Sequence, residues 1–179
     1  AHSYLGAPEQ LDRDTVLKQL RPLLENPHIG KIGQHLKYDT HVLANHGINL
    51  QGIVFDTMLA SYVLDATVTR HNLDDLAKHY LNYQTTTFEE LAGKGVKQLT
   101  FDQIEVEKAS HYACEDADIT LRLKELFVPK LLAEPALNHL FHDLEMPVAT
   151  ILQQMEARGT LLDFAQLRSE ERRVGKECL

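Results

Sequence analysis

The stretch HYACEDADIT, residues 111–120, places three acidic residues within four positions of a helical pattern. On a helix, Asp116 shares one face with the residues three, four and seven positions away. These neighbours are Ala109, Tyr112, Ile119, Thr120 and Leu123. Glu115 and Asp118 point elsewhere. A carboxylate within an apolar stripe costs free energy unless it is paired, hydrogen-bonded or bound to a metal ion, so Asp116 is a candidate functional residue.

A second helical segment, HLKYDTHVLANHG, repeats this arrangement. Asp39 shares its stripe with Leu36, Val42 and Leu43. If the two helices pack together, the two carboxylates could converge, and convergent carboxylates bind hard divalent cations such as Mg²⁺. Two such ions can clamp the attacking and leaving oxygens of a phosphodiester displacement. Each acid alone is also explained as a rim residue, or as one that accepts a hydrogen bond from a nearby amide.

Composition and charge limit the classes of protein. The chain has 179 residues, 44% of them hydrophobic, which fits one domain with or without part of another. The net charge is −8, and no basic patch precedes the last dozen residues, so contact with nucleic acid must be small or mediated by metal. Two cysteines make no disulfide framework and favour a reducing cytoplasm. The absence of a long apolar run or signal peptide argues against membrane insertion and secretion.

Turn and capping signals predict an α/β fold in which short strands alternate with helices. Strands are expected at 31–34 and 52–56. Asp12 and Asp56 are predicted helix caps, and Gly47 is a predicted helix end. Helices are expected at about 13–24, 35–47, 57–65, 71–81 and 106–127.

Three further signals concern the second half of the chain. Thr100 with Gln103 forms a capping-box pattern ahead of the longest helix. Pro129 is expected to bend or end that helix. After about Glu134 the pattern is helical throughout, with Pro135 and Pro147 as breaks, so we predict a domain boundary near residues 130–135.

Six separated segments carry a resemblance: GQHLKYD, FDTMLASYVLD, RHNLDDLA, TTTFEELAGKG, YACEDADITLRL and EMPVATILQQMEARGTLLD. Together they resemble the bacterial DNA polymerase I family, family A, over about residues 1–167. The resemblance implies a ribonuclease-H-like 3′–5′ exonuclease (proofreading) domain at 1–133, lacking its first strands, and the helical start of a polymerase domain at 134–167.

The resemblance also implies catalytic roles. The family's Tyr-x-x-x-Asp motif matches Tyr112 and Asp116, which makes Asp116 a metal ligand and Tyr112 the group that orients the attacking water. The Asp of another family motif matches Asp39, which would help to hold a second metal ion. The implied cofactor is a pair of Mg²⁺ or Mn²⁺ ions. The implied reaction is hydrolysis of the terminal phosphodiester at a single-stranded DNA 3′ end.

Five positions match residues that touch the DNA 3′ end in the family: Gln34, His35, Tyr38, Arg70 and Phe88. His35 stands where family members usually have Asn, which implies altered substrate handling. Phe88 would stack on a base or act as a wedge, with core packing as the alternative. For Arg70 the alternative is a solvated charge. The expected partner is a single-stranded 3′ end or primer-template DNA, bound by a monomer in the bacterial cytoplasm at the nucleoid.

Both ends of the chain carry expectations. The family's first motif, Asp-x-Glu on the first strand, lies upstream of the matching region, and no predicted strand here contains it. We therefore expect the chain alone to lack nuclease activity. Residues 168–178, RSEERRVGKEC, match the translation of a sequencing adapter. We therefore expect 168–179 to be a technical addition and not a DNA-binding tail.

Three rival interpretations remain open. The exonuclease-like domain could be a catalytically silent scaffold of a polymerase, although retention of Asp39 and Asp116 argues against this. A stand-alone ribonuclease-D-like exonuclease is a second rival, which the polymerase-like segment EMPVATILQQMEARGTLLD disfavours. A helical interaction module without chemistry is the third, and it leaves both stripe acids unexplained.

Overall fold

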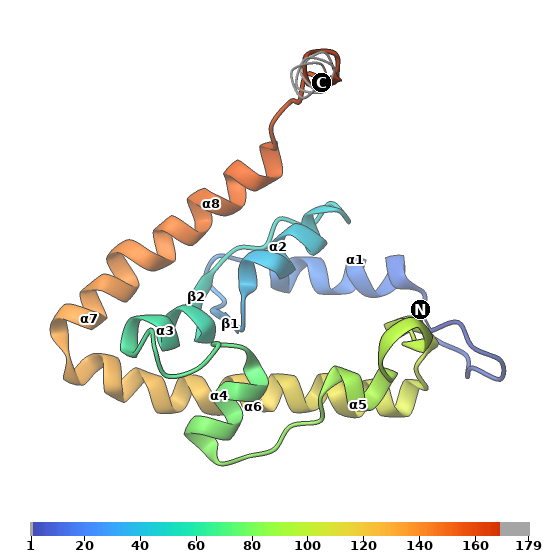
Figure 1. Ribbon diagram of the computed structural model, residues 1–179, viewed down its shortest axis with the longest axis horizontal. Coiled ribbons are helices and arrows are strands. Elements are labelled where there is room, and N and C mark those ends of the chain that lie inside the picture. The colour runs from blue at the N-terminus through green and yellow to red at the C-terminus, as the bar shows by residue number, and fades with distance from the viewer. Residues whose placement is uncertain (1, 169–179) are drawn as a thin grey trace, which may run out of the picture.

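A small parallel sheet lies at the centre of the computed structural model, which describes residues 2–168 (Figure 1). Strand β1 (Lys31–Gly33) pairs with β2 (Ile53–Asp56), with an irregularity after Lys31, and the described residues form no other sheet. Helix α2 (Leu36–Ala44) is the crossover between the two strands, as parallel pairing requires. The predicted α/β class and both predicted strands are confirmed. All but the first residue of the adapter-like stretch lies outside the described residues.

The remaining helices surround this sheet and extend away from it (Figure 1). Helix α6 is the longest, with α3, α4 and α5 along its length, and α8 leaves obliquely beyond its far end. The bounds are α1 Arg13–Leu24, α3 Thr57–Leu64, α4 Leu73–Leu81, α5 Phe88–Ala92, η1 Gly95–Lys97, η2 Phe101–Gln103, α6 Val106–Ala133, α7 Pro135–His139, the π-helical η3 Leu140–Glu145 and α8 Met146–Arg158.

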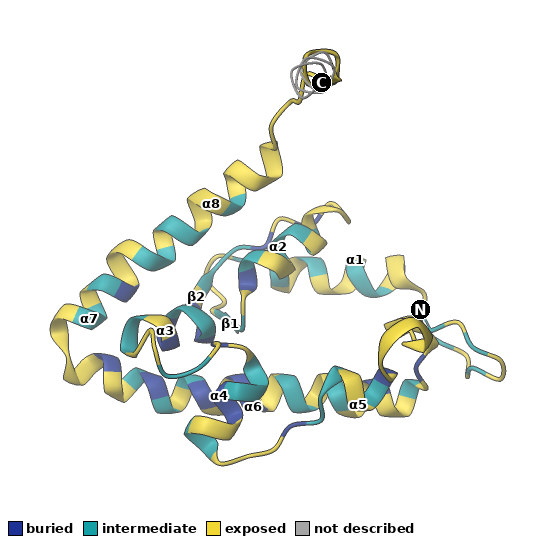
Figure 2. Cartoon of the chain, in the orientation of Figure 1, coloured by how far each residue is buried: buried dark blue, intermediate teal, exposed yellow. Residues whose placement is uncertain are grey.

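The buried face of α6 contributes more residues to the core than any other element (Figure 2). The predicted stripe is confirmed at Ala109, Ile119, Thr120 and Leu123, which are all buried. Its partners come from α3, α4, β2 and η3, and two aromatic pairs join them. Phe127 meets the edge of the Tyr80 ring at 4.8 Å between centroids, and Phe55 packs on Phe141 at 4.9 Å. A second, smaller cluster holds Ala92, Ile104 and Ala109.

Two details of the second half differ from the prediction. Helix α6 continues through Pro129 to Ala133, so the proline does not end it. The capping box of Thr100 and Gln103 is present, but it caps the start of η2 and not the start of α6. Helix α6 begins separately after Glu105. The reason is that Ile104 has an extended backbone between them. No helix within residues 2–168 combines the length and hydropathy needed to cross a lipid bilayer.

The segment after residue 134 contributes to the same core, because Phe141 has no exposed surface. We expect Phe141→Ala to lower the free energy of unfolding by about 3 to 5 kcal/mol, the usual cost of replacing a buried phenylalanine by alanine. Urea unfolding followed by circular dichroism measures the change. The control is Leu144→Ala, because Leu144 is 52% exposed on the same segment. Equal effects of the two variants would contradict the packing described here.

Candidate functional site

Asp116 is a half-buried carboxylate in the middle of the apolar face of α6. Burial raises its pKa to about 6, and the negative charges of Asp74 and Glu115 act in the same direction, while the Tyr112 hydroxyl opposes them. The pKa of Tyr112 is also raised, first by burial and then by Asp116. The phenol therefore stays protonated at neutral pH and can donate a hydrogen bond.

Asp74 is a candidate site residue that sequence reasoning missed. It lies in the first turn of α4, accepts a hydrogen bond from the Thr85 hydroxyl at 2.6 Å, and acts on the pKa of Asp116 from outside α6. Two adjacent acids at a helix start are explained by the helix dipole alone. No local signal could have indicated that one of them faces α6.

Asp39 lies in the first turn of α2 beside an apolar hollow of about 350 Å³. The apolar residues that line this hollow are Leu24, Ile32, Leu36, Val42, Leu43 and Leu50, so the predicted stripe is present. Although the residue as a whole is exposed, desolvation on this side raises the pKa of its carboxyl group. The charge of His35 opposes that shift and the charge of Asp56 adds to it.

The two acids do not form one ligand cluster in the described residues. The charges that shift the pKa of Asp39 are those of His35 and Asp56, and Asp116 is not among them. No group of three or more His, Cys, Asp or Glu residues suited to a metal ion occurs within residues 2–168. Both carboxylates are nevertheless oxygen donors destabilised by burial and by neighbouring acids. A hard cation held by one or two carboxylates together with substrate phosphate fits that chemistry.

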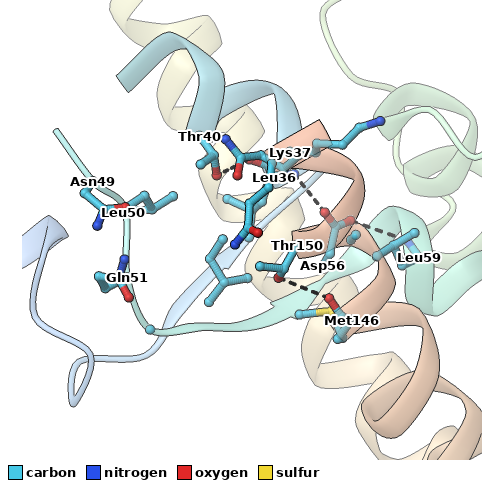
Figure 3. A pocket seen from close by; sticks show the side chains of 15 residues that line it. Leu36, Lys37, Thr40, Asn49, Leu50, Gln51, Asp56, Leu59, Met146 and Thr150 are labelled. Atoms are coloured by element: carbon cyan, nitrogen blue, oxygen red, sulfur yellow. Dashed lines mark hydrogen bonds between the residues drawn. The ribbon is translucent and has the colours of Figure 1, made fainter. Parts of the chain in front are cut away.

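Asp56 is structural, as the capping hypothesis predicted. Its carboxylate accepts hydrogen bonds from the backbone N–H groups of Met58 and Leu59 at the start of α3, at 2.9 and 3.4 Å. It also accepts from the backbone N–H groups of His35, at 3.1 Å, and Leu36, at 2.7 Å, at the start of α2. Figure 3 shows the bond from Leu36. One buried carboxylate thus fixes the N-termini of two helices.

His35 and Tyr38 form an exposed ring pair at the start of α2. Their ring centroids are 6.3 Å apart and the ring planes are nearly parallel. Tyr38 is 64% exposed. His35 has a φ of 60°, in the left-handed region that Asn and His enter more readily than most residues. Its backbone conformation is therefore compatible with both His and the Asn that the resemblance leads one to expect.

The other three predicted DNA contacts lie in different surroundings. The Gln34 amide is bonded internally, since it donates to the His71 carbonyl at 2.8 Å and accepts from the Thr57 hydroxyl. Arg70 is exposed and pairs with Asp75 at 3.0 Å. Phe88 is half-buried against the Ala92 cluster. Its core-packing alternative is therefore present, with part of the side chain left accessible.

Helix α8 is tied to α2 across a hollow of about 350 Å³ (Figure 3). Glu156 accepts hydrogen bonds from Lys37 at 2.5 Å and pairs with His41 at 3.0 Å. The bonds to Lys37 and His41 lower the pKa of its carboxyl group. This connection spans more than a hundred residues of sequence, and no local pattern indicates it.

The raised pKa of Asp116 predicts a dependence of stability on pH. Between about pH 4 and 6 the folded chain holds a proton at Asp116 that the unfolded chain releases. This contribution to stability is therefore present at low pH and is lost as pH rises through 6. We expect Asp116→Asn to stabilise the chain more at pH 7 than at pH 4 in urea unfolding. Asp118→Asn, at an exposed position two residues away, should show no such trend.

Comparisons with known proteins find a matching family profile and several similar proteins. A 3′–5′ exonuclease family profile of DNA polymerase A matches residues 2–132. The DNA polymerase I of Pseudomonas aeruginosa is 54% identical over all of this chain, and that of Rhizobium leguminosarum is 40% identical over 88% of it. The chain spans about a fifth of the first relative and 15% of the second.

A solved structure is also similar. It is the POL domain of Pol1 from M. smegmatis in complex with DNA primer-template and dNTP. The TM-score is 0.63 with 26% sequence identity, covering 90% of this chain and 25% of that one.

Proposed function

The chain belongs to the 3′–5′ exonuclease family of DNA polymerase A, a metal-dependent family, and from this we propose that it supplies part of a proofreading site. The proposed reaction removes the terminal nucleotide from a single-stranded DNA 3′ end. The observation that carries the proposal is Asp116 with Tyr112 one turn earlier, a desolvated carboxylate beside a protonated phenol within the family match.

Asp39 and Asp116 would hold the divalent cations, as oxygen ligands suited to Mg²⁺ or Mn²⁺. When bound, two such ions activate water and stabilise the leaving oxygen. The chain's own groups have distinct tasks. Tyr112, protonated at neutral pH, orients the attacking water by a hydrogen bond. His35 and Tyr38 offer ring faces on which the terminal base stacks.

Arg70 is the arginine among the five predicted DNA contacts, and its side chain is 85% exposed, so it would pair with a backbone phosphate. The exposed part of Phe88 would contact a neighbouring base. Gln34, whose amide is bonded inside the protein, acts by supporting these contacts. The proposed partner is therefore the 3′ end of DNA, and the proposed setting is a monomer in the bacterial cytoplasm. The relatives are bacterial DNA polymerases, which supports the DNA partner.

We also propose that residues 134–167 begin a polymerase domain. The end of α6 at Ala133 and the family match over 2–132 support this boundary. Neither β1 nor β2 contains the Asp-x-Glu pattern. The 179-residue chain alone is therefore expected to show no nuclease activity, because the family's first pair of carboxylates is not on its strands.

The test is a hybrid of the P. aeruginosa DNA polymerase I in which residues 2–132 of this chain replace the matching segment. The substrate is a 5′-labelled single-stranded oligonucleotide, and the products are resolved by gel electrophoresis. We expect Mg²⁺-dependent shortening from the 3′ end. A hybrid that extends primers normally but leaves the single strand intact would contradict the proposal and would favour the silent-scaffold rival.

A further inference from the structure

His71 is a buried, fully bonded histidine that no catalytic role accounts for. It is 2% exposed, and the Tyr62 ring stacks on it at 3.9 Å between centroids. Its Nδ1 lies 2.8 Å from the Ser61 hydroxyl and its Nε2 lies 3.2 Å from the Ala66 carbonyl. Because a carbonyl only accepts, Nε2 carries a proton, and in the neutral ring Nδ1 accepts from the Ser61 hydroxyl. Both nitrogens therefore anchor the ring to α3 and to the turn that follows it.

The backbone of His71 is held as firmly as its ring. Its φ is 58°, in the left-handed region, which costs free energy for a residue other than glycine. Its N–H donates to the Thr69 hydroxyl at 2.9 Å, and its carbonyl accepts from the Gln34 amide at 2.8 Å. Hydrogen bonds to the ring and to the backbone of His71 thus maintain an uncommon backbone conformation at this turn. The turn sets the direction of the chain as it enters α4.

The turn lies between Arg70 and Asp74, two residues of the proposed site. Arg70 precedes His71, and its guanidinium pairs with Asp75. Asn72 follows it, accepts from the Asp75 N–H as the cap of α4, and donates to the Asp75 carboxylate. The next residue but one is Asp74, whose charge acts on Asp116. The His71 turn therefore joins the exposed arginine to the start of the helix that faces the catalytic acid.

We propose that His71 is a positioning residue that orients the Arg70 guanidinium toward a phosphate of the bound DNA 3′ end. This inference rests on the proposed function, because it assigns Arg70 to the DNA. Hydrogen bonds from the ring to Ser61 and Ala66, and from the Gln34 amide to the His71 carbonyl, hold the left-handed turn. This turn fixes the direction in which the Arg70 side chain points. His71 itself touches no substrate and acts through Arg70.

The test is a double-mutant cycle in the 179-residue chain. Binding of a 5′-fluorescein decathymidylate in Mg²⁺ is followed by fluorescence anisotropy. Arg70→Gln is expected to weaken binding about tenfold, the low end of the effect of one charge-assisted hydrogen bond to phosphate. His71→Asn keeps a residue that tolerates the left-handed region but loses the two-sided ring anchor, and it should weaken binding to a similar degree. The double variant should bind no more weakly than Arg70→Gln alone.

Losses that multiply in the double variant would overturn the proposal, because His71 would then act independently of Arg70. His28→Asn, at an exposed turn, is the control and should leave binding unchanged. If His71→Asn proves unfolded by circular dichroism, Ser61→Ala takes its place in the cycle. That variant removes only the hydroxyl that bonds Nδ1, and a smaller, equally non-additive loss is expected.

A second readout separates this inference from the proposed function. The Arg70 Nε–H resonance, observed by ¹⁵N NMR without DNA, reports the pairing with Asp75. We expect it to shift in His71→Asn and to stay in place in His28→Asn. An unchanged resonance would overturn the positioning role even if DNA binds. If the chain binds no oligonucleotide but the resonance shifts, the DNA contact fails and the positioning of Arg70 by His71 stands.

Discussion

Replacing Asp116 by Asn in the hybrid polymerase is expected to slow removal of the 3′ nucleotide by roughly three orders of magnitude, or about 4 kcal/mol of transition-state stabilisation. The amide keeps the size of the side chain but loses the negative charge that would hold a divalent cation. Rates of single-stranded oligonucleotide shortening at saturating Mg²⁺ measure the effect.

Asp118→Asn is the matched control for that experiment. Asp118 lies on the same helix, is exposed, and pairs with Arg122 at 2.8 Å. Its loss should change the rate less than twofold, because exposed ion pairs contribute little. If both substitutions slow the reaction equally, or if neither does, Asp116 has no special role in the chemistry. Primer extension by the hybrid should be unaffected by either substitution, which excludes a general folding defect.

Asp56→Ala is expected to be the most destabilising single change outside the aromatic core. The carboxylate is 4% exposed and accepts four backbone N–H groups from the starts of α2 and α3. Removing it leaves buried donors at two helix N-termini without their partner. We expect the free energy of unfolding to fall by roughly 3 to 5 kcal/mol, as measured by urea unfolding of the 179-residue chain.

Two variants make the Asp56 prediction specific. Asp56→Asn keeps one accepting oxygen and should have an intermediate effect, because it can serve only one of the two helices fully. Asp12 caps α1 alone, through the Thr15 N–H and hydroxyl, at an exposed position. Asp12→Ala should therefore cost much less. Equal losses for Asp12→Ala and Asp56→Ala would contradict the double cap.

The sequence predicted those features that depend on residues a few positions apart. The apolar face of α6 followed from helical spacing, and the caps at Asp12 and Asp56 followed from their place before helical patterns. Pro129 was expected to bend or end α6, but the helix continues through it. Local propensity is overridden there by packing, because Phe127 and Leu131 on either side of the proline are buried.

Features that depend on distant residues could not be predicted in this way. Two of the four N–H groups that donate to the Asp56 carboxylate come from about twenty residues earlier in the chain. Asp74 acts on Asp116 from another helix, and Glu156 meets Lys37 across the hollow between α2 and α8. The local spacing of apolar and polar residues does not indicate such contacts. The catalytic roles of Asp39 and Asp116 rest on a resemblance of motifs and remain predictions.

Metal binding at Asp39 and Asp116 is best tested by titrating the ¹⁵N-labelled chain with Mn²⁺, a paramagnetic substitute for Mg²⁺ with the same preference for oxygen ligands. We expect selective broadening of amide signals around both acids. Asp39→Asn should reduce it around residue 39, Asp116→Asn should reduce it around residue 116, and Asp118→Asn should leave both regions as they are. Broadening that is absent from these regions, or that persists unchanged in the two variants, would contradict a metal-dependent exonuclease site at Asp39 and Asp116.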